Sequence, residues 1–117
     1  MSAISLQNRA VLIVEDEFLI ALEASETIEA CGATVIGPAY RLEEALKLVE
    51  ASRVDLALLD VNLNGELSDP VVFALQAKGV PVALTTGYGK TLPFSFSGPV
   101  LTKPYTPDEL LAVMGSL

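Results

Sequence analysis

The sequence of 117 residues contains no histidine and a single cysteine, Cys31. Without histidine the chain cannot build a histidine-based catalytic group, and with one cysteine it cannot form an internal disulfide. The same shortage rules out a zinc site built from the usual ligands. Cys31 is near the end of a predicted helix, and we interpret it as a small buried hydrophobic residue rather than a reactive thiol.

Positive charge is also scarce, because 7 lysines and arginines face 15 acidic residues and leave a net charge of -8. Binding to nucleic-acid phosphates or to an anionic membrane surface needs clustered lysine and arginine, so we expect neither as a partner. Long apolar runs are missing too. The first run, residues 10–14, is too short for a signal sequence or a membrane span, and we therefore expect a cytoplasmic protein.

Short apolar runs alternate with amphipathic segments along the whole chain, and 51% of the residues are hydrophobic. The length fits one domain, residues 1–117, and nearly continuous apolar runs are typical of strands buried on both faces of a parallel sheet. The pattern predicts a three-layer α/β fold. The expected strands are 10–14, 34–37, 54–60, 80–86 and 99–102, and the expected helices are 18–31, 42–50, 70–78 and 107–117.

Local signals set the expected boundaries of these elements. Residues 37–38 (Gly-Pro) predict a turn after the second strand, and residues 61–68 predict a loop. Asp69 is expected to cap the third helix, and Thr106 and Glu109 form the pattern of a capping box. Residues 90–97 contain a proline and no helical period, so a loop or turn is expected where strict alternation would place a fourth helix.

Polar side chains follow four of the expected strands, and the carboxyl ends of parallel strands meet at one edge of a sheet. The central strand ends in Asp60. The other candidates are Glu15 and Asp16 after the first strand, Asn62 just beyond Asp60, Thr86 and Gly87 after the fourth strand, and Lys103 after the fifth. We therefore expect these residues to share one crevice.

Clustered carboxylates repel one another, and a hard divalent cation relieves that repulsion. Mg²⁺ prefers oxygen ligands, so Asp16 and Asp60 are expected to bind it directly, with the backbone carbonyl of Asn62, and Glu15 to act through water. A carboxylate in such a site can attack a phosphoryl donor and hold the group as an acyl phosphate. Catalysis of such a transfer is mostly positioning and charge neutralisation, which Mg²⁺, Lys103 and the Thr86 hydroxyl are expected to supply.

Each of these residues also has an ordinary structural explanation. Glu15 can be a favourable charge at a helix N-terminus, Thr86 a β-forming residue at a strand end, and Lys103 a solvated surface lysine. Asp60 can be a polar strand terminus or a helix cap. We favour the functional interpretation because the set occurs at four separate strand ends.

The segments that carry these residues resemble the receiver domain of two-component response regulators. The matching motifs are Val-Leu-Ile-Val-Glu15-Asp16-Glu, Leu-Leu-Asp60-Val-Asn-Leu-Asn-Gly65, Thr86-Gly87 and Lys103-Pro104-Tyr105. The resemblance implies the flavodoxin-like strand order 2-1-3-4-5. It implies that Asp60 takes phosphate from a histidine kinase or a phosphotransfer protein, that Glu15 and Asp16 handle Mg²⁺, and that a cis peptide precedes Pro104.

Residues 81–88 are similar to the Pro-Phe-x-Phe-Ala-Thr-Gly-Tyr motif of a subgroup of alphaproteobacterial single-domain receivers. That subgroup implies a fourth helix that is short or absent, and kinases of the HWE type. Receivers ordinarily carry an aromatic residue three positions before the lysine, where this chain has Val100. One hypothesis is that a mobile segment 87–97, through Tyr88, Phe94 or Phe96, carries the signal; the alternative is that these aromatics only pack onto the sheet.

Phe18, Leu19 and Leu22 follow the acidic pair, so a helical bundle presenting the kinase histidine could dock on them. The alternative is packing against the last helix, which we favour for Leu19.

For the whole chain we expect a signalling module. One alternative is an enzyme that forms an aspartyl phosphate. Asn62 argues against it, because such enzymes commonly place an acid two residues after the nucleophile. The other alternative is a scaffold receiver that is never phosphorylated.

Overall fold

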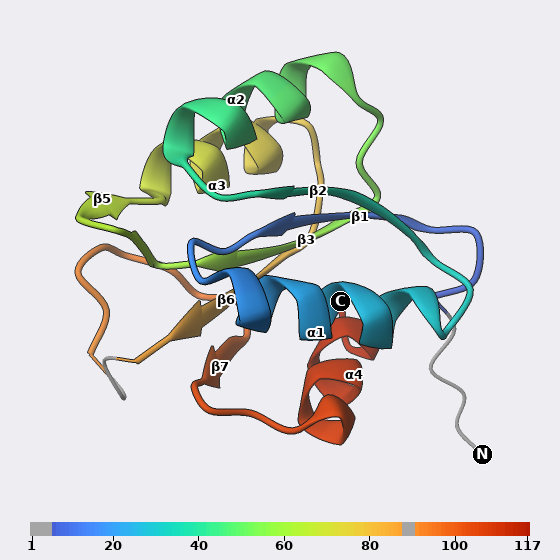
Figure 1. Cartoon of the computed structure of the whole chain (residues 1–117). Helices are drawn as coiled ribbons and strands as arrows, with labels where there is room; N and C mark the ends of the chain where they lie inside the picture. Colours follow the sequence, from blue (N-terminus) through green and yellow to red (C-terminus); the bar gives the residue numbers. More distant parts are fainter. Residues whose placement is uncertain (1–5, 88–90) are drawn as a thin grey trace.

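The computed structural model describes residues 6–87 and 91–117, and a five-stranded parallel sheet lies at its centre (Figure 1). The strand order is β2-β1-β3-β6-β7. The sheet strands are β1 (Ala10–Val14), β2 (Thr34–Ala39), β3 (Leu56–Asp60), β6 (Val82–Thr86) and β7 (Val100–Thr102). This confirms the predicted flavodoxin-like α/β fold, because the observed order equals 2-1-3-4-5 when only these five strands are counted.

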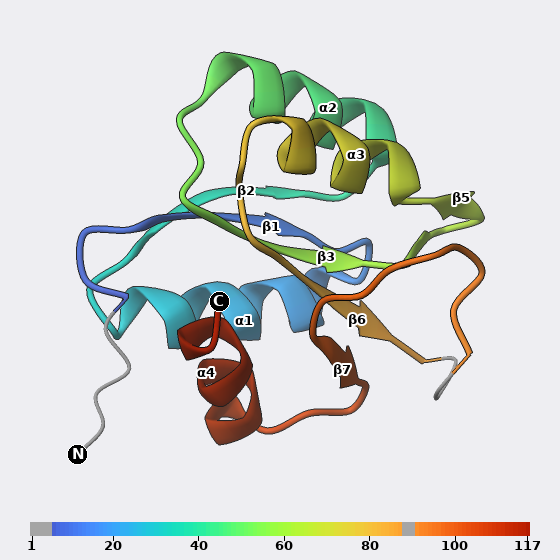
Figure 2. The same ribbon diagram turned by 180° about the vertical axis from the view of Figure 1, so that it is seen from behind.

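The described residues form four α-helices, two on each face of the sheet. They are α1 (Phe18–Glu29), α2 (Leu42–Ala51), α3 (Asp69–Ala77) and α4 (Pro107–Gly115). Helices α1 and α4 lie on one face, while α2 and α3 lie on the other (Figures 1 and 2). No helix in residues 6–87 or 91–117 is both long enough and apolar enough to span a membrane.

Alternate residues of each central strand belong to different hydrophobic clusters. Leu59 and Leu84 pack into the cluster beneath α2 and α3, whereas Leu58 and Ala83 pack into the cluster beneath α1 and α4. Every residue of β3 and β6 is buried. This explains the nearly continuous apolar character of these strands, since both faces are covered by helices.

The loop predicted for residues 61–68 is in part a short antiparallel hairpin. It consists of β4 (Asn62–Leu63) and β5 (Glu66–Leu67). Asn64 and Gly65 connect the two strands with φ angles of 54° and 100°. Asn-Gly is the preferred pair for a two-residue turn in which both residues have positive φ, so the prediction missed a signal that the sequence contains.

Three predicted boundaries are wrong by a few residues. The strand β2 does not end at residue 37 but continues to Ala39, because a register shift against β1 accommodates the Gly-Pro pair within the strand. Ser68, rather than Asp69, occupies the cap position of α3. Helix α1 ends at Glu29, so Cys31 lies just beyond the helix, where it is partly buried against the α1 and α4 cluster.

Other local expectations are confirmed. The Thr106 hydroxyl accepts a hydrogen bond from the Glu109 amide at 3.1 Å, and the Glu109 carboxylate accepts one from the Thr106 amide at 2.8 Å. This reciprocal pair is the predicted capping box of α4. The Lys103–Pro104 peptide bond is cis, as the family resemblance implied.

The described part of the connection between β6 and β7, residues 91–99, contains no helix, as predicted. Phe94 and Phe96 are partly buried against the α2 and α3 cluster. The Phe96 ring lies so close to Gly98 that a side chain there would come within 2.7 Å of it. The positions of Phe94 and Phe96 therefore agree with the alternative that these aromatics pack onto the sheet. Tyr88 lies outside the described residues, and an order change in this segment stays a prediction.

Candidate functional site

The strand ends bring Glu15, Asp60 and Lys103 into direct contact, although they are far apart in sequence. The Lys103 Nζ lies 3.1 Å from Glu15 Oε1 and 2.9 Å from Asp60 Oδ2. All three side chains are largely buried, with exposed fractions of 15% for Lys103, 5% for Glu15 and 6% for Asp60. The ordinary interpretation of Lys103 as a solvated surface lysine is therefore wrong.

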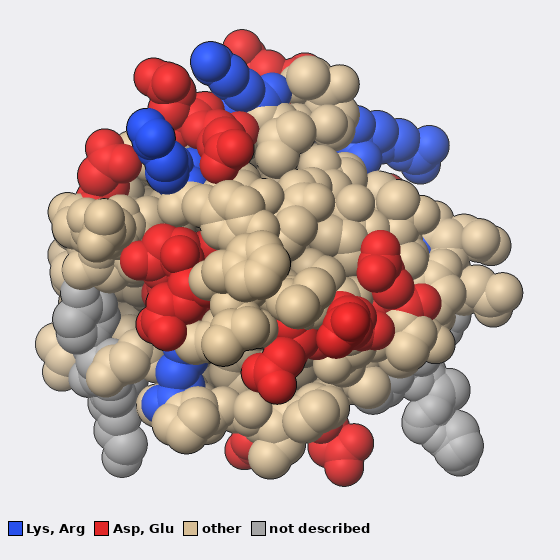
Figure 3. Space-filling view, viewed as in Figure 1, with Lys and Arg blue, Asp and Glu red and all other residues tan. Residues whose placement is uncertain are grey.

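Asp16 completes an acidic cluster with the two buried carboxylates. Each of Glu15, Asp16 and Asp60 offers one carboxylate oxygen, and these three oxygens lie within 4.8 Å of one another. The cluster borders an open cleft of about 670 Å³, which Asn62 and Gly87 also line. In the space-filling view, acidic side chains gather at the left of the molecule, where the strands end, with a basic side chain below them (Figure 3).

Backbone groups hold the acidic side chains in place. The Glu17 amide donates a hydrogen bond to Glu15 Oε2 at 3.0 Å, and the Asn62 amide donates a long one to Asp60 Oδ1 at 3.4 Å. The Asn62 side-chain carbonyl accepts a hydrogen bond of 2.6 Å from the Gly65 amide. The side chain of Asn62 therefore supports the hairpin turn, and the predicted use of its backbone carbonyl as a metal ligand stays a prediction.

Burial raises the pKa of Glu15 to about 7, and the neighbouring charge of Asp60 adds to the rise, while the Glu17 amide and Lys103 oppose it. Burial also raises the pKa of Asp60, against the opposing effect of Lys103. Burial by itself would lower the pKa of Lys103, but its hydrogen bonds and attraction to Asp60 and Glu15 raise that pKa above its ordinary value. The carboxylates thus share one strongly held ammonium ion.

The donor set fits a hard cation. Three carboxylates outnumber one ammonium in a mostly buried site, so their ionised forms leave uncompensated negative charge. All of the available ligand atoms in this cluster are oxygens, which Mg²⁺ prefers, and the open cleft leaves room for the water ligands that Mg²⁺ keeps. The predicted magnesium site is therefore chemically compatible with the arrangement of Glu15, Asp16 and Asp60.

Thr86 and Gly87 stand at the end of β6, but only Gly87 lines the cleft. Thr86 is fully buried, and its backbone carbonyl accepts a hydrogen bond of 2.9 Å from the Lys103 amide. This bond ties β6 to the residue that provides the ammonium. The predicted contact of the Thr86 hydroxyl with a phosphoryl group stays a prediction.

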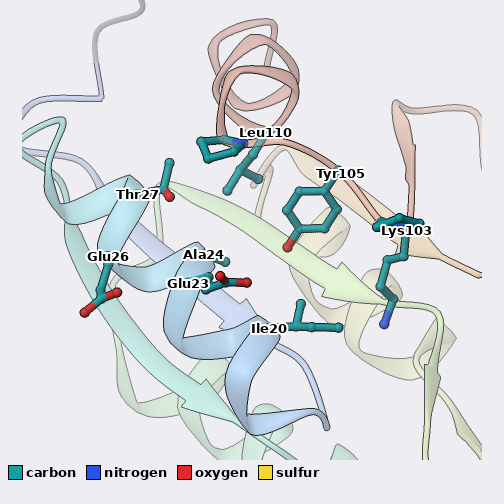
Figure 4. A pocket seen from close by; sticks show the side chains of 10 residues that line it. Ile20, Glu23, Ala24, Glu26, Thr27, Lys103, Tyr105 and Leu110 are labelled. Carbon is teal, nitrogen blue, oxygen red and sulfur yellow. The ribbon is translucent and has the colours of Figure 1, made fainter.

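A second cavity, of about 360 Å³, lies between α1 and α4 and shares Ile20, Lys103 and Pro104 with the acidic cleft. Tyr105 reaches from the segment before α4 towards α1 and forms part of its wall (Figure 4). Burial raises the pKa of Tyr105 to about 12, and the negative charge of Glu15 contributes to the rise. Tyr105 is not among the predicted site residues, although its place two residues after Lys103 could have indicated that it lies near the site.

The apolar residues at the start of α1 are exposed. The exposed fractions are 61% for Phe18, 70% for Leu19 and 41% for Leu22. The expectation that Leu19 packs against the last helix is therefore wrong. The Phe18 ring lies beside that of Tyr40, with 6.3 Å between the ring centroids. These three side chains form an apolar surface on the first turns of α1, and none of them lines the acidic cleft.

The family model of the response regulator receiver domain matches residues 11–114, which is most of the chain. The chain therefore belongs to the response regulator receiver domain family.

Two solved structures show close likeness to this chain. SdrG from Sphingomonas melonis Fr1 is 36% identical, with a TM-score of 0.82 and coverage of 99% of this chain and 98% of SdrG. The response regulator PhyR from Brucella abortus is 31% identical, with a TM-score of 0.83, and the match covers 96% of this chain and 49% of PhyR.

Curated relatives include the phyllosphere-induced regulator PhyR of Methylorubrum extorquens, which is 34% identical over 89% of this chain and 41% of that protein. The transcriptional regulatory protein YvrH of Bacillus subtilis is 31% identical over 92% of this chain and 48% of YvrH. The chain thus spans about half or less of the length of these curated relatives.

The raised pKa of Glu15 gives a prediction for metal-free protein in a chelator. The folded state holds the Glu15 proton more tightly than the unfolded state, so its contribution to stability is complete below about pH 4.5 and is lost as the pH rises through about 7. Glu15→Gln remains neutral and should exceed the unsubstituted protein in unfolding free energy by on the order of 2–3 kcal/mol at about pH 8, but not at about pH 4.

Chemical denaturation across this pH range measures the difference. Glu50→Gln, which changes an exposed carboxylate on α2, is the matched control and should keep the pH dependence of the original chain. Identical pH profiles for Glu15→Gln and the original chain would contradict the prediction.

Proposed function

We propose that residues 1–117 act as one receiver domain that accepts a phosphoryl group on Asp60, in the cytoplasm, from a histidine kinase or a phosphotransfer protein. The phosphorylated domain then changes its binding to a protein partner or serves as a phosphate sink. The observation that carries this proposal is the contact of the Lys103 ammonium with both Asp60 and Glu15 at the edge of an acidic cleft. Membership of the receiver family supports it.

The site's own residues supply most of what the transfer needs. An Asp60 carboxylate oxygen attacks the phosphorus of a phosphohistidine, the P–N bond breaks with its electron pair going to the imidazole, and an acyl phosphate forms. The Lys103 ammonium already lies 2.9 Å from Asp60 and can move to a phosphoryl oxygen. Mg²⁺ held by Asp16 and Asp60, with Glu15 assisting, would neutralise the negative charge of the phosphoryl group.

Asn62 favours a signalling module over an enzyme that turns over outside substrates. An amide at this position cannot act as the general acid that aspartyl-phosphate enzymes commonly place two residues after the nucleophile. Its side-chain carbonyl is moreover used by the Gly65 amide. The presence of all three carboxylates and the lysine argues against a scaffold that is never phosphorylated.

The proposed kinase contact lies on the exposed apolar surface formed by Phe18, Leu19 and Leu22. These side chains belong to the helix whose Ile20 lines the cleft, and an amphipathic helix of a kinase bundle can bury them while it presents its histidine to the cleft. The resemblance of residues 81–88 to the alphaproteobacterial motif makes an HWE-type kinase our first choice of partner.

The nucleophile is tested with acetyl phosphate and Mg²⁺. The unsubstituted protein should gain one phosphoryl group per chain, and Asp60→Asn should gain none, because an amide is not a nucleophile of comparable strength. Asp69→Asn, on α3 and outside the cluster, should be labelled normally. Intact-mass spectrometry reads the result. Equal labelling of Asp60→Asn, or continuous hydrolysis of varied phosphoesters, would contradict the proposal.

The docking surface is tested by phosphotransfer from a purified cognate kinase. Leu22→Glu should slow the transfer at least about tenfold, because it introduces a charge into a contact that must lose water. Phe73→Glu changes another exposed apolar residue, 58% exposed on α3, and should leave the rate unchanged. Labelling of both variants by acetyl phosphate shows that their sites are intact. Equal transfer rates for the two variants would reject docking on α1.

A further inference from the structure

Thr85, the residue before Thr86, carries a buried hydroxyl for which the described part of the chain offers no hydrogen-bond partner. The residue is buried, with an exposed fraction of 2%. Buried hydroxyls are nearly always paired, so an unpaired one requires an explanation. A threonine is not needed here for packing alone, since valine has nearly the same shape.

The hydroxyl belongs to the face of the sheet that carries the site. Side chains alternate along β6, and Ala83, two residues earlier, packs beneath α1 and α4. Leu58, two residues before Asp60 on β3, belongs to the same cluster. Thr85 and Asp60 are paired directly across the two parallel strands. Their side chains are therefore neighbours on one face.

The lysine side chain also spans β6, the strand that carries Thr85. Lys103 follows β7, while its partners Asp60 and Glu15 belong to the ends of β3 and β1. The strand β6 lies between β7 and β3 in the sheet, so the Lys103 side chain must cross β6 to reach its partners. The residue of β6 that is level with Asp60 is Thr85.

An unpaired buried hydroxyl disfavours the state that contains it by roughly fivefold to a hundredfold relative to a state in which it is paired. In the structure described here, the Asp60 carboxylate is held by the Lys103 ammonium at 2.9 Å, and Thr85 remains outside this contact. A state in which the ammonium moves to a phosphoryl oxygen frees a carboxyl oxygen of Asp60. Thr85, the residue of β6 that is paired with Asp60, carries a hydroxyl that can then replace the lost donor.

We propose that Thr85 is a positioning residue whose hydroxyl donates a hydrogen bond to Asp60 only when a phosphoryl group has drawn the Lys103 ammonium away. The hydroxyl destabilises the resting protein and so favours the phosphorylated state. This inference rests on the proposed function of Asp60 as phosphoryl acceptor. It assigns Thr85 a role in the equilibrium between the two states rather than in the chemical step.

The test compares Thr85→Val with the unsubstituted protein in two measurements. Without metal, the variant should be more stable, with a midpoint of thermal unfolding higher by about 4 °C, because an unpaired hydroxyl has been removed. With Mg²⁺, its affinity for the phosphoryl mimic beryllium trifluoride should fall about tenfold, because the paired state has lost its hydrogen bond. Thr85→Ser retains the hydroxyl and should restore the affinity.

Ser68→Ala provides a matched control, because the Ser68 hydroxyl is also buried and without a hydrogen-bond partner in the described residues, but it belongs to the start of α3. This variant should leave the affinity for the mimic unchanged. Unchanged affinity in Thr85→Val, or a loss of its stability, would overturn the role of Thr85 while the function of Asp60 stands. Failure of the unsubstituted protein to bind the mimic would reject the proposed function together with this inference.

Discussion

The contact of one buried ammonium with two buried carboxylates is the interaction on which this site depends. Lys103 reaches across the sheet from the end of β7 to Asp60 and Glu15, at 2.9 and 3.1 Å. Without the lysine, burial would leave two neighbouring carboxylates with no compensating charge. With the lysine in place, the site still carries excess negative charge, which a metal ion can neutralise. The same ammonium provides positive charge for an incoming phosphoryl group.

The parallel sheet makes this contact possible. Its strand order places β1 and β3 side by side, so that Glu15 and Asp60 follow adjacent strands, and β6 separates them from Lys103. The central strands β1 and β3 are almost entirely buried, and the carboxylates of Glu15 and Asp60 lie where these two strands end. The site is thus a consequence of the fold, because it collects polar side chains from the carboxyl ends of β1, β3 and β7.

Sequence reasoning recovered the sheet and the acidic cluster because both depend on residue type and order. Short apolar runs predict buried strands, and the polar residues that end them must meet at one edge. It could not recover the exposure of Leu19, since helical periodicity does not say which apolar residues lack a neighbouring element. The unpaired hydroxyl of Thr85 was equally hidden, because hydrogen-bond partners depend on the register between strands. The hairpin at Asn64 was predictable and was missed.

A high-resolution crystal structure of the protein grown with Mg²⁺ tests the central claim most directly. The account predicts one ion bound by oxygens of Asp16 and Asp60, with the Lys103 ammonium still within hydrogen-bond distance of the Asp60 carboxylate. An ion bound away from these carboxylates, or a Lys103 side chain extended into solvent, would contradict it.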